Sequence, residues 1–109
     1  MVVEYIRYAV PADQADRFER AYQKGREAFD ASDHCLSYEL AQGVEEPEHW
    51  IVRIEWDSLE GHEQGFRRSA EFGPFFQAVK PFFEQIEEMR HYRVTGIAAR
   101  KPAGEHAAR

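Results

Sequence analysis

The segment His49-Trp-Ile-Val-Arg-Ile-Glu-Trp56 decides the fold, because its residues alternate strictly in character. One face would carry four large apolar side chains, namely Trp50, Val52, Ile54 and Trp56. The other face would be mixed, with His49, Ile51, Arg53 and Glu55. A period of two is typical of a β-strand with one buried face. The segment therefore predicts a strand whose apolar side packs against helices.

Three other segments alternate in the same way, and we expect strands at residues 2–10, 34–42 and 85–95. A short polar turn, which contains a glycine and a proline, separates the second strand from the third and predicts a hairpin. In the last strand the apolar positions place Tyr92 on the buried face. His91 would then lie on the opposite face, because neighbouring side chains of a strand point in opposite directions.

Two helical regions lie between these strands. Apolar residues recur at three- and four-residue steps from Ala15 to Phe29, which predicts a helix after the first strand. The sequence Asp57-Ser-Leu-Glu60 resembles a helix-capping box, so a second helix should begin there. The pair Gly73-Pro74 would interrupt it, and a short helix is expected at residues 75–80.

The resulting order, β-α-β-β-α-β, predicts an α+β, ferredoxin-like fold with an antiparallel sheet. The helices would cover one face of the sheet. The bare face mixes apolar and charged residues, namely Val3, Tyr5, Ile51 and Met89 with Arg7, Arg53, Glu55 and His91. Such a face suits a twofold contact between two sheets, so we expect a homodimer formed through the sheet faces. Exposure of this face to solvent is the alternative.

The length of 109 residues allows one domain, which we place at residues 1–95. Residues 96–109 are rich in small and charged residues, and we expect this tail to be disordered. Aromatic residues make up 14% of the chain, more than so small a core needs. Some of these rings should therefore line an interface or a cavity for a small apolar or aromatic ligand.

The charge and the motifs exclude several classes of function. A net charge of −6 argues against binding to nucleic acid or to an anionic membrane surface. Cys35 is the only cysteine, so no disulfide forms within the chain and a zinc site with several thiolates is excluded. The sequence has no signal-peptide pattern and no apolar run of about 20 residues, and we expect a cytoplasmic protein. No motif indicates a flavin, a nicotinamide or a metal ion, so no cofactor is expected.

With the elements placed, the chain resembles the antibiotic biosynthesis monooxygenase family. The resemblance covers residues 2–95 and depends on the order and spacing of four stretches. These are residues 2–12, residues 50–58, the segment from Gly61-His62 to Phe75-Phe76, and the closing Glu88-Met-Arg-His-Tyr92. The resemblance implies that two ferredoxin-like chains form a dimeric α/β barrel. It also implies a small-substrate monooxygenase, since the family includes cofactor-independent oxygenases of aromatic phenols and quinols.

The haem-degrading branch of the family can be compared with this chain residue by residue. In that branch an Asn, a Trp and an iron-ligating His occupy positions that correspond to Ile6, Phe66 and Phe76 here. None of these three side chains can bind iron or its oxygen, so haem degradation in that manner is not expected. Ligation of haem by His62 is left as a second alternative function.

His62 is the candidate catalytic residue. It lies at helical spacing between Leu59 and Phe66, so its ring should point towards the sheet. A neutral imidazole there could remove a phenolic proton and create a carbanion that reacts with oxygen. The alternative is a core histidine that is hydrogen-bonded to a carbonyl or a tyrosine.

Aromatic side chains are the candidate walls of the substrate pocket, namely Tyr8, Tyr38, Trp50, Phe66 and Tyr92. For Trp50, simple core packing is an equal alternative. The function we expect is a cofactor-independent monooxygenase for a small aromatic, phenolic or quinol substrate. A non-catalytic binding or accessory domain with the same pocket is the first alternative.

Overall fold

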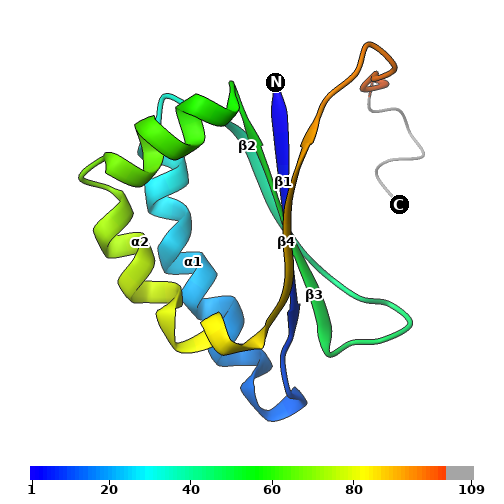
Figure 1. Cartoon of the computed structure of the whole chain (residues 1–109). Coiled ribbons are helices and arrows are strands. Elements are labelled where there is room, and N and C mark those ends of the chain that lie inside the picture. Colours follow the sequence, from blue (N-terminus) through cyan, green and yellow to red (C-terminus); the bar gives the residue numbers. More distant parts are fainter. Residues whose placement is uncertain (103–109) are drawn as a thin grey trace.

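The computed structural model describes residues 1–102 and has two layers, a four-stranded sheet and a layer of helices on one side of it (Figure 1). The main elements are β1 (Val2–Ala9), α1 (Ala15–Ala31), β2 (Cys35–Gln42), β3 (His49–Trp56), α2 (Phe72–Val79) and β4 (Ile86–Arg93). Shorter helical turns are Ala12–Gln14, a π-helical turn at Gly61–Gly65, Phe66–Arg68 and Lys80–Gln85. The predicted α+β class and the ferredoxin-like order of elements are confirmed.

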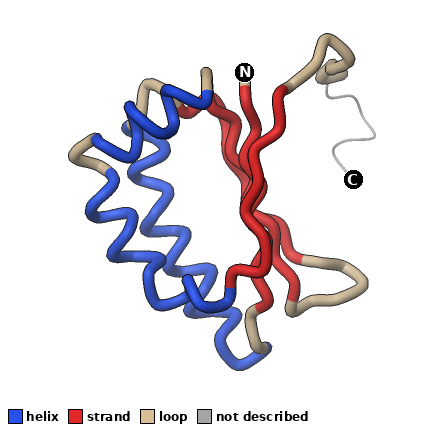
Figure 2. Tube along the Cα trace, in the orientation of Figure 1, coloured by secondary structure: helices blue, strands red, loops and turns tan. Residues whose placement is uncertain are grey.

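The sheet has the strand order β2-β3-β1-β4, and every neighbouring pair is antiparallel. Helices α1 and α2 both lie on the same side, and no helix of residues 1–102 covers the opposite face of the sheet (Figure 2). The central strands β1 and β3 pair along their whole lengths, with Ile6 opposite Val52. A side chain on the inner face of β1 is therefore held between the sheet and the helices.

The alternation in β3 is confirmed. Its four apolar side chains are buried, with Trp56 fully so, and they pack against aromatic residues of α1. Phe18 of α1 contacts Trp50, and Phe29 contacts Trp56. Burying a side chain of this kind stabilises the fold by about 1.5–3 kcal/mol. This shared core fixes α1 over the centre of the sheet.

The predicted orientation of β4 is wrong, because one extra residue interrupts its pairing with β1. Tyr8 lies opposite Ile86 but Arg7 lies opposite Glu88, so Glu87 has no partner and forms a bulge. A bulge of one residue reverses which side chains of a strand point to which face. Beyond it His91 faces inwards, opposite Glu4.

Tyr92 is displaced by the same bulge. It was expected on the buried face, but it lies on the outer face opposite Val3 and is 49% exposed. There its ring meets Tyr5 edge to face, with the centroids 5.7 Å apart. Met89 moves in the opposite direction and joins the inner face, where it lies opposite Ile6.

The helical region after β3 also differs from the prediction. Ser58, not Asp57, caps it, because the Ser58 Oγ accepts a hydrogen bond of 2.8 Å from the amide of Gly61. Asp57 instead lies 2.8 Å from the Nδ1 of His34. Helix α2 begins three residues earlier than predicted, at Phe72, because Pro74 falls in its first turn, where a missing amide proton costs little.

The last described residues, 96–102, form no helix or strand. The rest of the expected disordered tail lies outside the described residues, and the boundary at residue 95 stays a prediction. Within residues 1–102 no helix has both the length and the apolar character needed to cross a membrane.

Candidate functional site

A cavity of about 440 Å³ lies between the sheet and the helical layer. Its walls are almost wholly apolar and aromatic, and include Ile6, Tyr8, Phe66, Phe75, Phe76 and Met89. Its polar lining includes Glu4 of β1, His62 of the π-helical turn and Arg67 of the turn that follows. The cavity therefore combines planar apolar walls with ionisable side chains.

The ionisable side chains come together from three distant parts of the chain. Glu4 occupies an inner position of β1, and the bulge in β4 turns His91 towards it. His62 enters from the π-helical turn, and its Nδ1 lies 2.9 Å from the Nε2 of His91 in a hydrogen bond. The His62 Nε2 lies 3.5 Å from the Glu4 Oε1. We refer to Glu4, His62 and His91 as the Glu-His-His cluster.

Trp56 positions two members of the cluster. Its Nε1–H donates a hydrogen bond of 3.1 Å to the Glu4 Oε1. Its indole also stacks on the imidazole of His62, with the centroids 4.5 Å apart and the planes 12° from parallel. A buried carboxylate and a buried imidazole are thus held by the same side chain, which itself is fully buried in the core.

Burial is the main cause of the shifted pKa values of Glu4 and His62. Glu4 and His62 are each only 3% exposed. Burial raises the pKa of Glu4, although the Trp56 hydrogen bond and the charges of His91 and Arg67 act in the opposite direction. Burial also lowers the pKa of His62 to about 3, and Arg67 and His91 add to this effect. The imidazole of His62 is therefore neutral near pH 7. One of its ring nitrogens then has a lone pair that can accept a hydrogen bond or a proton.

Two tyrosine hydroxyls add a second polar group to the cavity wall. Tyr8 and Tyr22 share a hydrogen bond of 2.6 Å, and both are buried. Burial raises the pKa of Tyr8 to about 12 and raises that of Tyr22 well above its ordinary value. Both phenols are neutral over the physiological range, so they orient a ligand by hydrogen bonding and not by charge.

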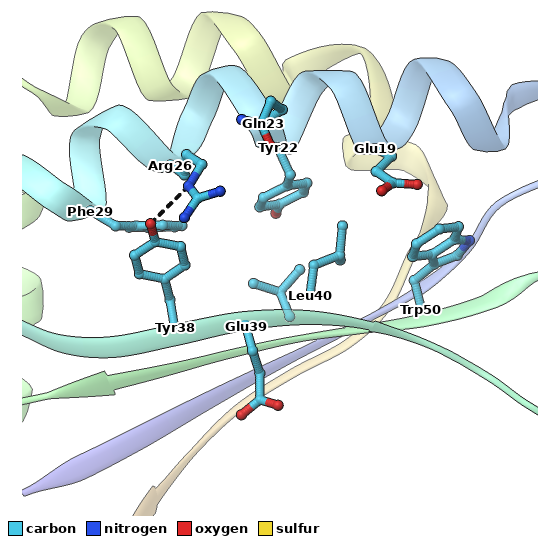
Figure 3. Close-up of a pocket in the computed structure, with 10 residues that line it drawn as sticks. Glu19, Tyr22, Gln23, Arg26, Phe29, Tyr38, Glu39, Leu40 and Trp50 are labelled. Carbon is cyan, nitrogen blue, oxygen red and sulfur yellow. Dashed lines mark hydrogen bonds between the residues drawn. The ribbon is translucent and has the colours of Figure 1, made fainter. Parts of the chain in front are cut away.

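A second hollow, of about 270 Å³, lies between α1 and the strands β2 and β3 (Figure 3). Tyr38 stands at one end, where its hydroxyl accepts a hydrogen bond from Arg26 Nε at 2.9 Å and donates one to Asp30 at 2.6 Å. Trp50 stands at the other end (Figure 3). Tyr22 borders both hollows.

The predicted site residues therefore separate into three groups. Tyr8, His62 and Phe66 line the larger cavity, as expected for one pocket. Tyr38 and Trp50 line the second hollow instead. Tyr92 lies on the outer face of the sheet and contributes to neither. The candidate site is therefore the cavity that Tyr8, His62 and Phe66 share.

Sequence reasoning missed Glu4, His91 and Arg67. For Glu4 a signal was present, because a carboxylate interrupts an otherwise apolar alternating face of the first strand. For His91 the alternation was misleading, since the bulge reverses it. Side-chain atoms of Glu4, His62 and His91 that could bind a metal ion all lie within 4.8 Å of one another. No local spacing motif could show this, because the three residues are far apart in sequence.

The three positions that correspond to the haem-degrading branch all lie in one part of the molecule. Ile6, Phe66 and Phe76 all line the larger cavity, where they form apolar wall. His62 already contacts Glu4, His91 and Trp56. A haem iron bound by His62 would have to replace the hydrogen bond to His91 or the contact with Glu4.

Comparison with known proteins agrees with this fold. In sequence, the chain is similar to the uncharacterised protein YczJ of Bacillus subtilis, with 23% identity over 93 residues that cover 85% of this chain and 98% of YczJ. In structure, it is similar to a protein of Bordetella bronchiseptica that is described by name as an antibiotic biosynthesis monooxygenase. That match has a TM-score of 0.71 and 22% identity, and covers 86% of this chain and 96% of the other.

A third relative, Rv0793 of Mycobacterium tuberculosis, has a TM-score of 0.71 and 14% identity, with 90% of this chain and 98% of Rv0793 covered. At these identities the solved structures show that the fold is shared. Residues 1–78 match the family described as antibiotic biosynthesis monooxygenase. The chain therefore belongs to the antibiotic biosynthesis monooxygenase family.

Proposed function

We propose that this protein is a monooxygenase that oxidises a small aromatic, phenolic or quinol substrate in the larger cavity. The observation that carries the proposal is the composition of that cavity. The cavity has a volume of about 440 Å³ and mostly apolar and aromatic walls. Its lining also contains the buried Glu4, the neutral imidazole of His62 and the guanidinium of Arg67. A planar substrate would stack on the rings and direct its hydroxyl towards the polar groups.

The reaction needs no external reductant, because the substrate supplies the electrons. In a phenol or naphthol that carries hydrogen para to its hydroxyl, the His62 imidazole accepts the phenolic proton, and the electron-rich para carbon forms a bond to O₂. Cleavage of the O–O bond then leaves one oxygen on the ring as a second carbonyl, and the other departs as water. The phenol loses two hydrogen atoms, gains one oxygen atom and becomes a quinone, which is a four-electron oxidation matched by the reduction of O₂.

The neighbours of His62 compensate for its weakness as a base. An imidazole whose pKa is depressed to about 3 does not hold a proton by itself. The carboxylate of Glu4, 3.5 Å from Nε2, would stabilise the imidazolium as it forms. Arg67 lines the same cavity and would stabilise the phenolate. This arrangement favours charge separation only when a substrate anion is present.

Oxygen uptake across a panel of naphthols and hydroquinones tests the proposal. The wild-type chain should consume O₂ above the protein-free rate with at least one compound, and His62→Ala should lose about 10²-fold or more of that rate. His49→Ala, which removes a half-exposed histidine outside the cavity, is the matched control and should retain full activity. Compounds that raise the melting temperature but are never consumed would contradict an enzyme and favour a binding domain.

We also propose that two copies of the chain associate through the outer face of the sheet. Tyr5 and Tyr92 are 37% and 49% exposed there, beside the buried Val3. Light scattering after size exclusion should give the mass of a dimer, and Tyr92→Glu should shift it towards a monomer. A monomeric wild-type protein at micromolar concentration would contradict this.

A further inference from the structure

We propose that Glu4, His62 and His91 form a binding site for one divalent transition-metal ion at the wall of the cavity. Among residues 1–102 this is the one group of three metal-ligating side chains whose ligand atoms meet within 4.8 Å. Two imidazoles and one carboxylate are the ligand set of catalytic zinc sites and of non-haem iron sites. The proposal goes beyond the proposed oxygenase function and does not depend on it.

The three side chains lie close enough to share an ion after an adjustment, since their ligand atoms meet within 4.8 Å. The Nδ1 of His62 faces His91, whereas its Nε2 is the nitrogen that lies 3.5 Å from the Oε1 of Glu4. The Nδ1 of His62 and the Nε2 of His91 are 2.9 Å apart. The Nε2 of His91 and the Oε2 of Glu4 are 3.9 Å apart. In a tetrahedral site with bonds of about 2.1 Å, neighbouring ligand atoms are about 3.4 Å apart, between these two values. His91 is the partly exposed member and can make the adjustment, since its side chain is 26% exposed.

Trp56 supports this ligand set from outside. By donating to the Oε1 of Glu4 it leaves the Oε2 oriented towards His91. By stacking on His62 it fixes the plane of that imidazole. A ligand that is oriented by a second group binds a metal more tightly, because less freedom is lost on binding.

Three protein ligands leave at least one coordination position open. Glu4 and His62 both line the larger cavity, so a fourth ligand would approach from that side. This is the arrangement of catalytic rather than structural metal sites, in which water or a substrate oxygen completes the coordination. A phenolate or quinol oxygen in the cavity is a ligand of the right class.

The charge of Arg67 opposes a cation, and the ligand types set the expected selectivity. Arg67 places a positive charge at the same cavity, so hard cations such as Mg²⁺ and Ca²⁺, which need several oxygen ligands, should bind poorly. The imidazoles favour ions from the later part of the first transition series. A bound ion would also use the lone pair of His62, so metal binding and proton transfer by His62 are alternative states of one site.

The test is calorimetric titration of the full chain, without a polyhistidine tag and freed of metal by a chelator, with Co²⁺ and with Zn²⁺. One ion should bind per chain, and Co²⁺ should develop the visible absorption of a site with nitrogen ligands. His91→Ala and Glu4→Gln should each weaken binding by tenfold or more. Glu4→Gln keeps the shape of the side chain, so a loss of binding in a folded variant reports the missing carboxylate.

Two further variants make the result decisive. Arg67→Gln should bind Co²⁺ more tightly than the wild type, which a site elsewhere on the surface would not do. His49→Ala should bind normally, because His49 lies near Glu46 and Glu87 and outside the cluster. Absence of binding in the folded wild type, or binding that is lost in His49→Ala and kept in His91→Ala, would overturn the proposal. Because no substrate is used, failure here leaves the oxygenase proposal unaffected.

Discussion

The hydrogen bond from Trp56 to Glu4 gives the sharpest stability prediction. Trp56→Phe keeps an aromatic ring against His62 but removes the N–H that donates to the buried carboxyl at 3.1 Å. A buried acceptor that loses its partner costs about 1–3 kcal/mol, and more when it is charged. The smaller ring adds a packing loss, so a control is needed to separate the two effects.

Trp50→Phe is that control. Trp50 lies on the same inner face of β3 and is 4% exposed, but its Nε1 has no hydrogen-bond partner within the described part of the chain. Replacing it removes a similar volume without breaking a hydrogen bond. The free energy of unfolding should therefore fall by about 1–3 kcal/mol more in Trp56→Phe than in Trp50→Phe.

Urea unfolding followed by far-ultraviolet circular dichroism measures this difference, because the signal does not depend on tryptophan fluorescence. In a domain of this size, each kcal/mol of that difference should separate the melting temperatures of the two variants by about 4–8 °C. Equal losses in the two variants, or a larger loss in Trp50→Phe, would refute the view that Trp56 supports the Glu-His-His cluster.

Three further predictions concern other parts of the molecule. The pKa of Tyr8 is about 12 in the folded chain, above the ordinary value of 10.0, so its neutral phenol stabilises the fold fully below pH 10. This contribution of about 2–3 kcal/mol to the free energy of unfolding is lost as the pH rises from 10 through 12. In urea titrations at alkaline pH, the combined Tyr8→Phe and Tyr22→Phe variant should therefore lose stability less steeply than the wild type. Gly43→Ala should lower the unfolding free energy by about 1–3 kcal/mol, because a Cβ there meets the backbone of the following turn, whereas Gly96→Ala, in open space, should match the wild type in the same urea assay. Burial raises the pKa of Cys35 to about 11, so its alkylation by iodoacetamide should keep accelerating past pH 10, and a plateau near 9.0 would be inconsistent with the structure.

Much of the fold follows from periodicity. The alternation from His49 to Trp56 identified a strand and its buried face, because four large apolar side chains cannot share one face of an exposed strand. The apolar stripe from Ala15 to Phe29 identified α1 for the same reason. These patterns are strong because burial acts on every second residue of a strand, and on every third or fourth residue of a helix.

The candidate site was less predictable, because it depends on one irregularity. The bulge at Glu87 turns His91 inwards and Tyr92 outwards, and no hydrophobic pattern indicates where a strand gains a residue. Tyr38 and Trp50 lie on the predicted inner face, but α1 separates their hollow from the larger cavity by placing Tyr22 between them. Which aromatic residues share a cavity is a property of packing, and the sequence alone shows only which face they lie on.

The most direct test of the account is to follow both atoms of isotopically labelled O₂ during turnover of a naphthol by the wild-type chain. The proposed reaction predicts one labelled oxygen atom in the quinone and one in water, at a rate that His62→Ala lowers by about 10²-fold or more. A quinone whose new oxygen comes from water, or a labelled product formed equally fast by His62→Ala, would contradict oxygenation at the polar groups of this cavity.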